Sequence, residues 1–157
     1  MALFPQPFDQ IRPITERDLP EFLAIRNDVR HHLHDSREFS IEECRSWFRV
    51  TNQVYLGIFN YNSMMGYFRL KRIDLITLEV GLDLCKNYFG KGVAFFAYQF
   101  FFDWLQSNSE ILILQLRVLR HNQRAMRLYE KLGFVVVEEL PDDYLMKKLL
   151  IPNKSEA

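Results

Sequence analysis

Two glycines, Gly90 and Gly92, separate a predicted strand over Leu78–Leu84 from a long apolar helix that begins at Val93. The first N–H groups of a helix have no partner inside the helix, and the helix dipole is positive at that end. A glycine turn at this place lets several backbone N–H groups converge on one anion. The segment Gly90–Ala94 therefore predicts a phosphate-binding loop, although the same glycine spacing also occurs in ordinary turns.

Two other phosphate motifs do not fit this loop. A dinucleotide-binding fingerprint requires a third glycine where the chain has Phe95. A Walker A loop ends in Gly-Lys-Ser or Gly-Lys-Thr, whereas this loop continues as Gly92-Val93-Ala94. The predicted anion site thus belongs to neither of these classes of nucleotide-binding protein.

Further along the chain, a short helix is predicted over 123–132, and it carries a tyrosine, Tyr129. Asn122 precedes it as an N-cap residue, and Gly133 follows its end. Tyr129 lies beside the apolar stripe that Ala125 opens, so its phenol can serve either as a proton donor or as a half-buried packing anchor.

The elements that must position these residues form one α/β domain. The strands predicted from periodicity are 11–14, 54–59, 65–70, 78–84, 111–118, 134–138 and 144–149. Two helices precede the main sheet: the first has its apolar face over Phe22–Leu33, and the second begins at the capping box Ser40–Glu43. Helices over 93–106 and 123–132 follow. We expect a mixed, mostly antiparallel central sheet flanked by helices.

The composition agrees with a single domain. The chain has 157 residues, of which 48% are hydrophobic and 25% are charged, so it can bury a sizeable core. Twenty basic and twenty acidic residues cancel, which argues against nucleic acid or an anionic membrane as a partner. We expect one domain over 1–157, with a core over about 9–150 and a short tail over 151–157.

Cysteine usage and the N-terminus indicate a cytoplasmic protein. Cys44 and Cys85 lie far apart without metal-ligand spacing, which favours a reducing compartment. The segment Met1–Phe8 has two prolines and no basic region before an apolar run, so it does not fit a signal peptide. The apolar stretch Val93–Leu105 is too short to span a bilayer, which takes about 20 residues.

Together, the glycine loop, the tyrosine helix and the order of the elements resemble the GNAT family of N-acetyltransferases. The family pattern Gln/Arg-x-x-Gly-x-Gly/Ala falls on residues 89–94, where Phe89 replaces the usual Gln or Arg. Asn122, Ala125, Tyr129 and Gly133 match the second motif of the family. The first two helices resemble the branch that acetylates ribosomal-protein N-termini and amino groups of nucleotide-linked sugars.

This resemblance implies a GNAT fold with acetyl-CoA as co-substrate, held between two splayed strands. Its pantetheine arm would pair with the exposed strand backbone, and Gly81 would let that backbone be approached closely. The implied cofactor-binding residues are Leu82, Asp83, Leu84, Phe89, Gly90, Lys91, Gly92, Val93, Ala94, Asn122, Ala125 and Tyr129.

The resemblance also implies the catalytic groups. An alkyl ammonium has a pKa of about 10.4 and must lose a proton before it attacks the thioester. Glu79 would take that proton, and Asp83, which lies on the same strand face through the period of two, is the alternative. Tyr129 would return a proton to the CoA sulfur, and a backbone N–H near Leu82–Leu84 would polarise the carbonyl. Each carboxylate can equally be a solvated strand residue.

The acceptor is expected beneath the first two helices. By resemblance, Arg26, Asn27, Arg30 and His31 line its site, and the guanidinium groups would suit a phosphate or carboxylate on the acceptor. The alternative is an ordinary solvated helix face. A metal site on a helix face at His31 and the residues three and four positions later is not expected, because the run lies at a helix end without cysteine.

We therefore predict an N-acetyltransferase acting on a small-molecule or peptide amine. The alternative is a GNAT-fold module that binds CoA or an acyl-CoA, or scaffolds a partner, without turnover. The presence of both Glu79 and Tyr129 favours the enzyme, whereas Phe89 favours the binding module. The sequence leaves the acceptor and the oligomeric state open, a homodimer included.

Overall fold

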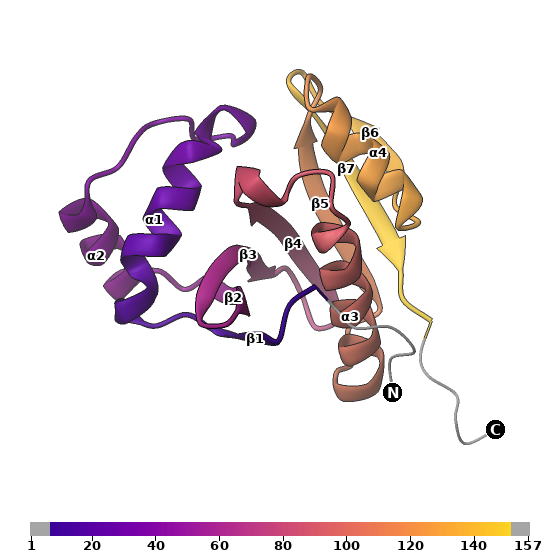
Figure 1. The fold of residues 1–157 in the computed structure, drawn as a ribbon. Coiled ribbons are helices and arrows are strands. Elements are labelled where there is room, and N and C mark those ends of the chain that lie inside the picture. The colour runs from indigo at the N-terminus through magenta and orange to yellow at the C-terminus, as the bar shows by residue number, and fades with distance from the viewer. Residues whose placement is uncertain (1–6, 152–157) are drawn as a thin grey trace.

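Seven strands form one mixed sheet in the computed structural model, which describes residues 7–151 (Figure 1). The predicted tail beyond residue 151 lies outside these residues. The strands are β1 (Gln10–Pro13), β2 (Val54–Asn60), β3 (Ser63–Arg72), β4 (Thr77–Leu84), β5 (Ile113–Leu119), β6 (Val135–Glu139) and β7 (Asp143–Leu149). They lie in the order β1-β2-β3-β4-β5-β7-β6. Neighbouring strands run antiparallel except for β4 and β5, which run parallel.

Four α-helices flank the sheet: α1 (Leu19–Asp28), α2 (Ile41–Val50), α3 (Val93–Asn108) and α4 (Gln123–Lys131). Short 3₁₀ turns occur at η1 (Glu16–Asp18), η2 (Arg30–His32) and η3 (Lys86–Tyr88). In Figure 1, α1 and α2 lie at one side of the molecule, and α3 and α4 lie at the other. The predicted order of strands and helices is confirmed.

Local sequence explains several element boundaries. Ser40 accepts a hydrogen bond from the Glu43 backbone N–H at 3.2 Å, and the Glu43 carboxylate accepts one from the Ser40 N–H at 3.1 Å. This capping box starts α2, as predicted. The β2–β3 hairpin turns at Tyr61 and Asn62, whose φ angles of 50° and 66° are those of a tight type I′ turn.

The first helix is shorter than its apolar pattern predicts. It ends at Asp28 and continues only as the 3₁₀ turn η2, so the expected helical face through Leu33 is wrong. The Asn27 side chain bonds both backbone groups of Phe39, donating to its carbonyl at 2.9 Å and accepting from its N–H at 3.1 Å. These bonds hold the following loop back against α1.

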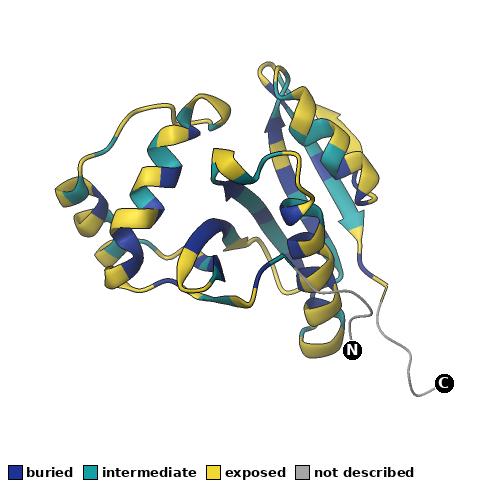
Figure 2. Cartoon of the chain, viewed as in Figure 1, coloured by how far each residue is buried: buried dark blue, intermediate teal, exposed yellow. Residues whose placement is uncertain are grey.

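Two hydrophobic clusters cover the two sheet faces. The larger lies between the sheet and α3 with α4, and it includes Phe68, Tyr98 and Phe134. The smaller lies beneath α1 and α2, where Phe22 and Tyr67 pack with ring centroids 4.4 Å apart. In Figure 2 the buried residues mark the sheet and the inner helix faces, while the outer faces are exposed. The sheet therefore carries packed apolar side chains on both of its faces.

The parallel pair β4 and β5 separates after three residue pairs. The paired residues are Thr77–Glu79 on β4 and Ile113–Gln115 on β5. Beyond Glu79 and Gln115 the two strands no longer pair with each other. The remainder of β4, Val80–Leu84, pairs only with β3. The splayed pair expected from the sequence is thus present.

Among residues 7–151, no helix combines the length and the apolar character needed to cross a membrane.

Candidate active site

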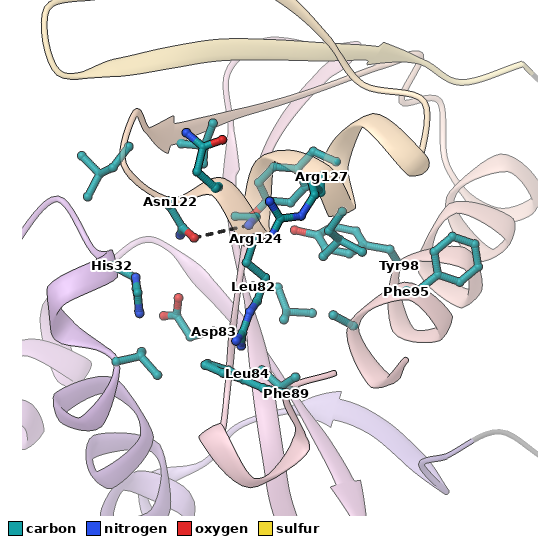
Figure 3. A pocket seen from close by; sticks show the side chains of 18 of the residues that line it. His32, Leu82, Asp83, Leu84, Phe89, Phe95, Tyr98, Asn122, Arg124 and Arg127 are labelled. Carbon is teal, nitrogen blue, oxygen red and sulfur yellow. Dashed lines mark hydrogen bonds between the residues drawn. The ribbon is translucent and has the colours of Figure 1, made fainter. Parts of the chain in front are cut away.

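A cavity of about 860 Å³ occupies the gap between the splayed strands. Its walls come from the end of β4, the end of β5, the loop before α3 and the inner face of α4 (Figure 3). Leu82, Asp83 and Leu84 line it on one strand, and Val118 lines it on the other. The separation of the strands therefore creates a deep cleft that exposes strand backbone.

The glycine loop forms the entrance to α3. Gly90 and Gly92 have φ angles of +74° and +80°, which other residues rarely adopt. Gly92 is the N-cap residue of α3, and it makes no side-chain cap. The helix N-terminus thus faces the cavity with its first N–H groups uncovered by a capping side chain. Most of the loop lines the cavity, but Lys91 does not.

Phe89, which departs from the family pattern, contacts a positively charged side chain. The Arg124 guanidinium lies 4.2 Å above the centre of the Phe89 ring, a cation–π contact that orients the guanidinium. Both residues line the cavity. The chain therefore holds a positive charge beside the glycine loop through this ring and α4.

The cavity is basic although the whole chain has no net charge. Its charged lining consists of Arg69, Arg117, Arg124, Arg127 and Lys131, opposed by Asp83 alone; His32, His34 and His121 lie among them. Burial lowers the pKa of His32, and the neighbouring positive groups lower it further. This local excess of positive charge suits a ligand with several phosphates.

Tyr129 lines the cavity, as does Tyr98. Tyr129 is only 8% exposed and packs edge-on against Tyr98, with ring centroids 6.0 Å apart. Burial raises the pKa of both phenols, so both hydroxyls stay protonated at neutral pH. The Tyr98 hydroxyl has no hydrogen-bond partner among residues 7–151. Two proton donors thus lie together in the lining of the cavity.

Asn122 caps α4, as predicted: its side-chain oxygen accepts a hydrogen bond from the Ala125 N–H at 3.3 Å (Figure 3). Both residues also line the cavity. The cap and a ligand contact are compatible, because the amide nitrogen of Asn122 is not used by the cap.

The two predicted acidic residues have different surroundings. Glu79 lies where β4 and β5 are still paired, accepts a hydrogen bond from Gln115 at 3.0 Å and lines neither this cavity nor the one described next. Asp83 is 5% exposed and lines both. Its carboxylate faces Arg69, whose Nη2 donates to Oδ1 at 3.2 Å and whose Nε lies 3.1 Å from Oδ2.

Gly81 serves this ion pair. A side-chain Cβ at position 81 would lie 2.5 Å from the Arg69 guanidinium. The glycine therefore makes room for Arg69. The close approach of a ligand to the strand at Gly81 stays a prediction.

A second cavity, of about 470 Å³, lies beneath α1 and α2. It shares Leu33, His34, Arg69 and Asp83 with the first cavity. Its remaining lining residues come from α1, α2, the loop between them, and strands β2 and β3 with the residue before β2. The two cavities thus meet at the end of β4.

Of the four predicted acceptor residues, only one lines either cavity. Arg26 lines the second cavity, but its guanidinium is bound to the backbone carbonyls of Asp35 and Arg37. Asn27 fastens the loop at Phe39, as described above. Arg30 donates to the Asn27 carbonyl at 2.9 Å. The exposed His31, like Arg30, lines neither cavity.

A contact across the cleft joins the two halves of the site. His34 Nε2 lies 2.6 Å from Asp143 Oδ2 at the start of β7. The Asp143 side chain is 7% exposed, so this is a largely desolvated contact on the carboxylate side. His34 is not on a helix, so the helical metal-ligand spacing considered above does not form. Among residues 7–151, no three His, Cys, Asp or Glu side chains are grouped as metal ligands.

Arg69 is a site residue that the sequence analysis missed, whereas the tyrosine two positions before it, Tyr67, was among the aromatic residues that could line a pocket. Arg69 and Tyr67 lie two residues apart on β3, which places both side chains on the face toward α1 and α2. That alternation was the available signal for Arg69. The pairing of His34 gave no signal, because its partner lies 109 positions away.

Solved structures share this fold. An acetyltransferase of the GNAT family from Streptococcus pneumoniae is 24% identical with a TM-score of 0.70, covering 90% of this chain and 99% of that one. An N-acetyltransferase from Staphylococcus aureus Mu50 is 18% identical with a TM-score of 0.72, covering 90% and 98%. The yncA protein of Salmonella typhimurium, solved with its cofactor acetyl-CoA, is 17% identical with a TM-score of 0.73, covering 93% and 96%.

The sequence comparison gives one match and one absence. The family model of the acetyltransferase (GNAT) domain matches residues 10–135. No curated protein matches the chain.

Proposed function

This chain belongs to the GNAT acetyltransferase family, and from that membership we propose that it transfers the acetyl group of acetyl-CoA to a primary amine by direct attack. The observation that carries the proposal is the junction of two cavities at Asp83. One cavity is basic and opens on a glycine loop, and the other is lined by side chains beneath α1 and α2. A cofactor and an acceptor can therefore meet from opposite sides.

The first cavity fits the cofactor. The N–H groups at the start of α3 and the Arg124 guanidinium suit the phosphates of CoA. The end of β4, Leu82–Leu84, and the free amide nitrogen of Asn122 suit the pantetheine amides. When bound, acetyl-CoA supplies an activated acetyl thioester. Gly90, Gly92, Val93, Ala94, Phe89, Ala125 and Tyr129 complete this proposed lining, whereas Lys91, which we expected among these residues, does not line the cavity.

Asp83 is our candidate for receiving the acceptor ammonium. It lines both cavities, whereas Glu79 is bound to Gln115 outside them. A proton leaves the ammonium to Asp83, directly or through water, and the neutral amine attacks the thioester carbonyl. The C–N bond forms as the C–S bond breaks.

Tyr129 is our candidate for the acid. Burial raises the pKa of its phenol, so the group carries its proton throughout the neutral range and can donate it to the leaving thiolate. The nitrogen then gives up its second proton, which restores the Tyr129 phenol through solvent, and Asp83 releases the first proton to solvent. The products are an amide, the free thiol of CoA and one proton. A backbone N–H of Leu82–Leu84 is the proposed donor to the thioester oxygen.

Two measurements test the proposal. Thermal unfolding with CoA should show a higher melting temperature, because a ligand at about 100 times its Kd adds about 2.7 kcal/mol of stability. Thiol release from acetyl-CoA with a panel of primary amines should exceed the release without amine. A CoA-induced shift without amine-dependent thiol release would indicate a binding module instead.

The absence of any shift at millimolar CoA, with a folded protein, would contradict the cofactor assignment itself. An unrelated thiol ester that lacks the nucleotide serves as the control. It should give neither the shift nor rapid thiol release, because the glycine loop and Arg124 would have no phosphate to bind.

A further inference from the structure

We propose that the acceptor is a primary amine carried on an uncharged, aryl-bearing body, and that its ammonium binds at Asp83 and Tyr67 in the second cavity. This inference rests on the proposed transfer of acetyl groups to amines and names the class of acceptor. It differs from the anionic acceptor that the arginines of α1 led us to expect.

The walls of the second cavity are aromatic. Phe22 and Trp47 stack with ring centroids 5.7 Å apart and an interplanar angle of 11°, and Tyr55 packs edge-on against Trp47 at 5.1 Å. Phe39 and the leucines Leu23 and Leu33 complete the apolar lining. A flat ring gains contact area and favourable ring geometry in such surroundings.

The arginines and acidic groups of this cavity already have partners within the protein. Asp35 lies 2.8 Å from Arg37 and 3.9 Å from Arg26, and Arg26 also covers the Phe39 ring at 4.3 Å. The Glu43 carboxylate accepts the hydrogen bond of the capping box.

Arg69, the third arginine, is paired with Asp83 as described above. A phosphate or a carboxylate on the acceptor would compete with the groups that these arginines already bind, and a second ammonium would compete for Asp35 or Glu43, so an uncharged body is favoured.

Polar atoms with incomplete hydrogen bonding gather where this cavity meets the first. Among residues 7–151, Tyr67 Oη makes no hydrogen bond, and Asp83 Oδ2 and Arg69 Nε lie 3.1 Å apart as an ion pair in which neither atom makes a hydrogen bond. Tyr67 has no exposed surface, and Asp83 is 5% exposed. Burial raises the pKa of Tyr67, so its hydroxyl stays neutral. The carboxylate keeps lone pairs beside Arg69, so an ammonium can donate to Asp83 Oδ2 and to the Tyr67 hydroxyl while Arg69 stays hydrogen-bonded to Oδ1.

The position of these atoms agrees with the chemistry. Asp83 lines both cavities, so an amine bound there lies toward the proposed cofactor site while its body remains in the second cavity, which Trp47 and Phe39 line. The same carboxylate that recognises the ammonium then accepts its proton.

The decisive experiment measures kcat/KM for four amines with the intact protein: 2-phenylethylamine, ethanolamine, spermidine and a phosphorylated amino sugar. We expect 2-phenylethylamine to exceed the other three at least about tenfold, since hydrophobic pockets discriminate about 10- to 200-fold per group. Preference for spermidine or for the phosphorylated sugar would overturn the inference while leaving the proposed function intact. Thiol release with none of the amines would overturn both.

Two variants test the residues. Trp47→Leu should lower kcat/KM for 2-phenylethylamine about tenfold and change that for ethanolamine less than twofold. Phe48→Ala is the matched control, because Phe48 is the next aromatic on α2 and does not line the cavity. An equal loss in both variants would overturn the role of Trp47.

Tyr67→Phe separates recognition from folding. Its hydroxyl makes no hydrogen bond with residues 7–151, so removing it should leave the melting temperature unchanged or higher, while KM for the amine rises about fivefold and the Kd for CoA stays constant. A lower melting temperature with an unchanged KM would show that the hydroxyl is structural and would overturn the proposed ammonium site.

Discussion

The proposed cofactor cavity and the proposed acceptor cavity meet at Asp83, yet they are built from different parts of the chain. The first uses backbone from short contiguous segments, the loop before α3 and the start of α4, and adds basic side chains around it. The second is assembled from side chains of α1, α2, their connecting loop and β2–β4. A backbone site requires a fixed local conformation, whereas a side-chain site can change with each substitution.

The difference shows why one cavity carries the family signature and the other does not. Main-chain N–H groups can bind phosphate whatever the neighbouring side chains are, so under the proposed function Phe89 can replace the usual Gln or Arg while Arg124, above its ring, supplies the charge. The ring-lined acceptor cavity depends on side-chain identity at every position. Variants on the two sides should therefore produce separable defects.

The largest effect is expected at the glycine loop. Gly92→Glu places a carboxylate at the α3 N-terminus, and we expect the Kd for CoA to rise at least about 1,000-fold, or about 4 kcal/mol. The position has a φ of +80°, so Gly92→Ala is the control for backbone strain alone. Isothermal titration of both variants checks this. Equal affinities in Gly92→Glu and the wild type would mean that the phosphates bind elsewhere.

Tyr129→Phe should give the next largest effect, on the chemical step only. Removal of one proton donor with almost no change of volume should lower kcat about 10- to 1,000-fold and leave the Kd for CoA nearly constant. Tyr144→Phe is the control, because its hydroxyl lies near Arg120 and outside both cavities. An unchanged kcat, with chemistry shown to limit the rate, would reduce Tyr129 to a packing role.

Two asparagines offer a direct test of the separation. Asn27→Ala removes both bonds to Phe39 and should cost about 1–3 kcal/mol of stability, with a higher KM for the amine and an unchanged Kd for CoA. Asn122→Ala removes a helix cap, which costs about 1 kcal/mol, and should weaken CoA binding instead. Urea unfolding and steady-state kinetics check both. If Asn27→Ala weakened CoA binding, or if Asn122→Ala raised the KM for the amine, the two cavities would not be independent.

A smaller effect is expected where the two halves touch. His34→Ala leaves the buried carboxylate of Asp143 without its partner, and we expect a loss of about 1 kcal/mol together with weaker binding of both substrates. Asp143→Asn keeps a neutral hydrogen bond and should be milder. Differential scanning calorimetry measures the loss. A larger penalty from Asp143→Asn would contradict the assignment of the desolvated carboxylate as the sensitive partner.

The smallest effect at neutral pH concerns the buried phenols. Burial raises the pKa of Tyr98 well above its usual value, and that of Tyr55 to about 12. Their stabilisation is complete below the unfolded pKa of about 10 and is lost as the pH rises through the folded pKa. Urea unfolding should therefore show stability falling above pH 10, and less steeply in Tyr98→Phe. If stability fell as steeply with pH in Tyr98→Phe as in the wild type, Tyr98 would not contribute to this pH dependence.

The element order and the cofactor loop could be predicted because their signals are local. Gly90 and Gly92 mark a loop conformation that few other residues adopt, and Asn122 and Ser40 mark helix starts through bonds to residues three positions away. The roles assigned to Tyr129, Glu79 and Asp83 rest on family resemblance and remain proposals. Periodicity alone placed Glu79 and Asp83 on one face.

Only the tertiary structure decided which carboxylate reaches the site and what surrounds the acceptor. The register of β4 against β5 leaves Glu79 beside Gln115, while the splay beyond it leaves Asp83 between the two cavities. From the sequence we expected the Arg26 guanidinium to be available to an acceptor, yet it donates hydrogen bonds to backbone carbonyls of the loop between α1 and α2. Such outcomes depend on contacts between residues far apart in the chain, whose geometry is fixed by packing rather than by local pattern.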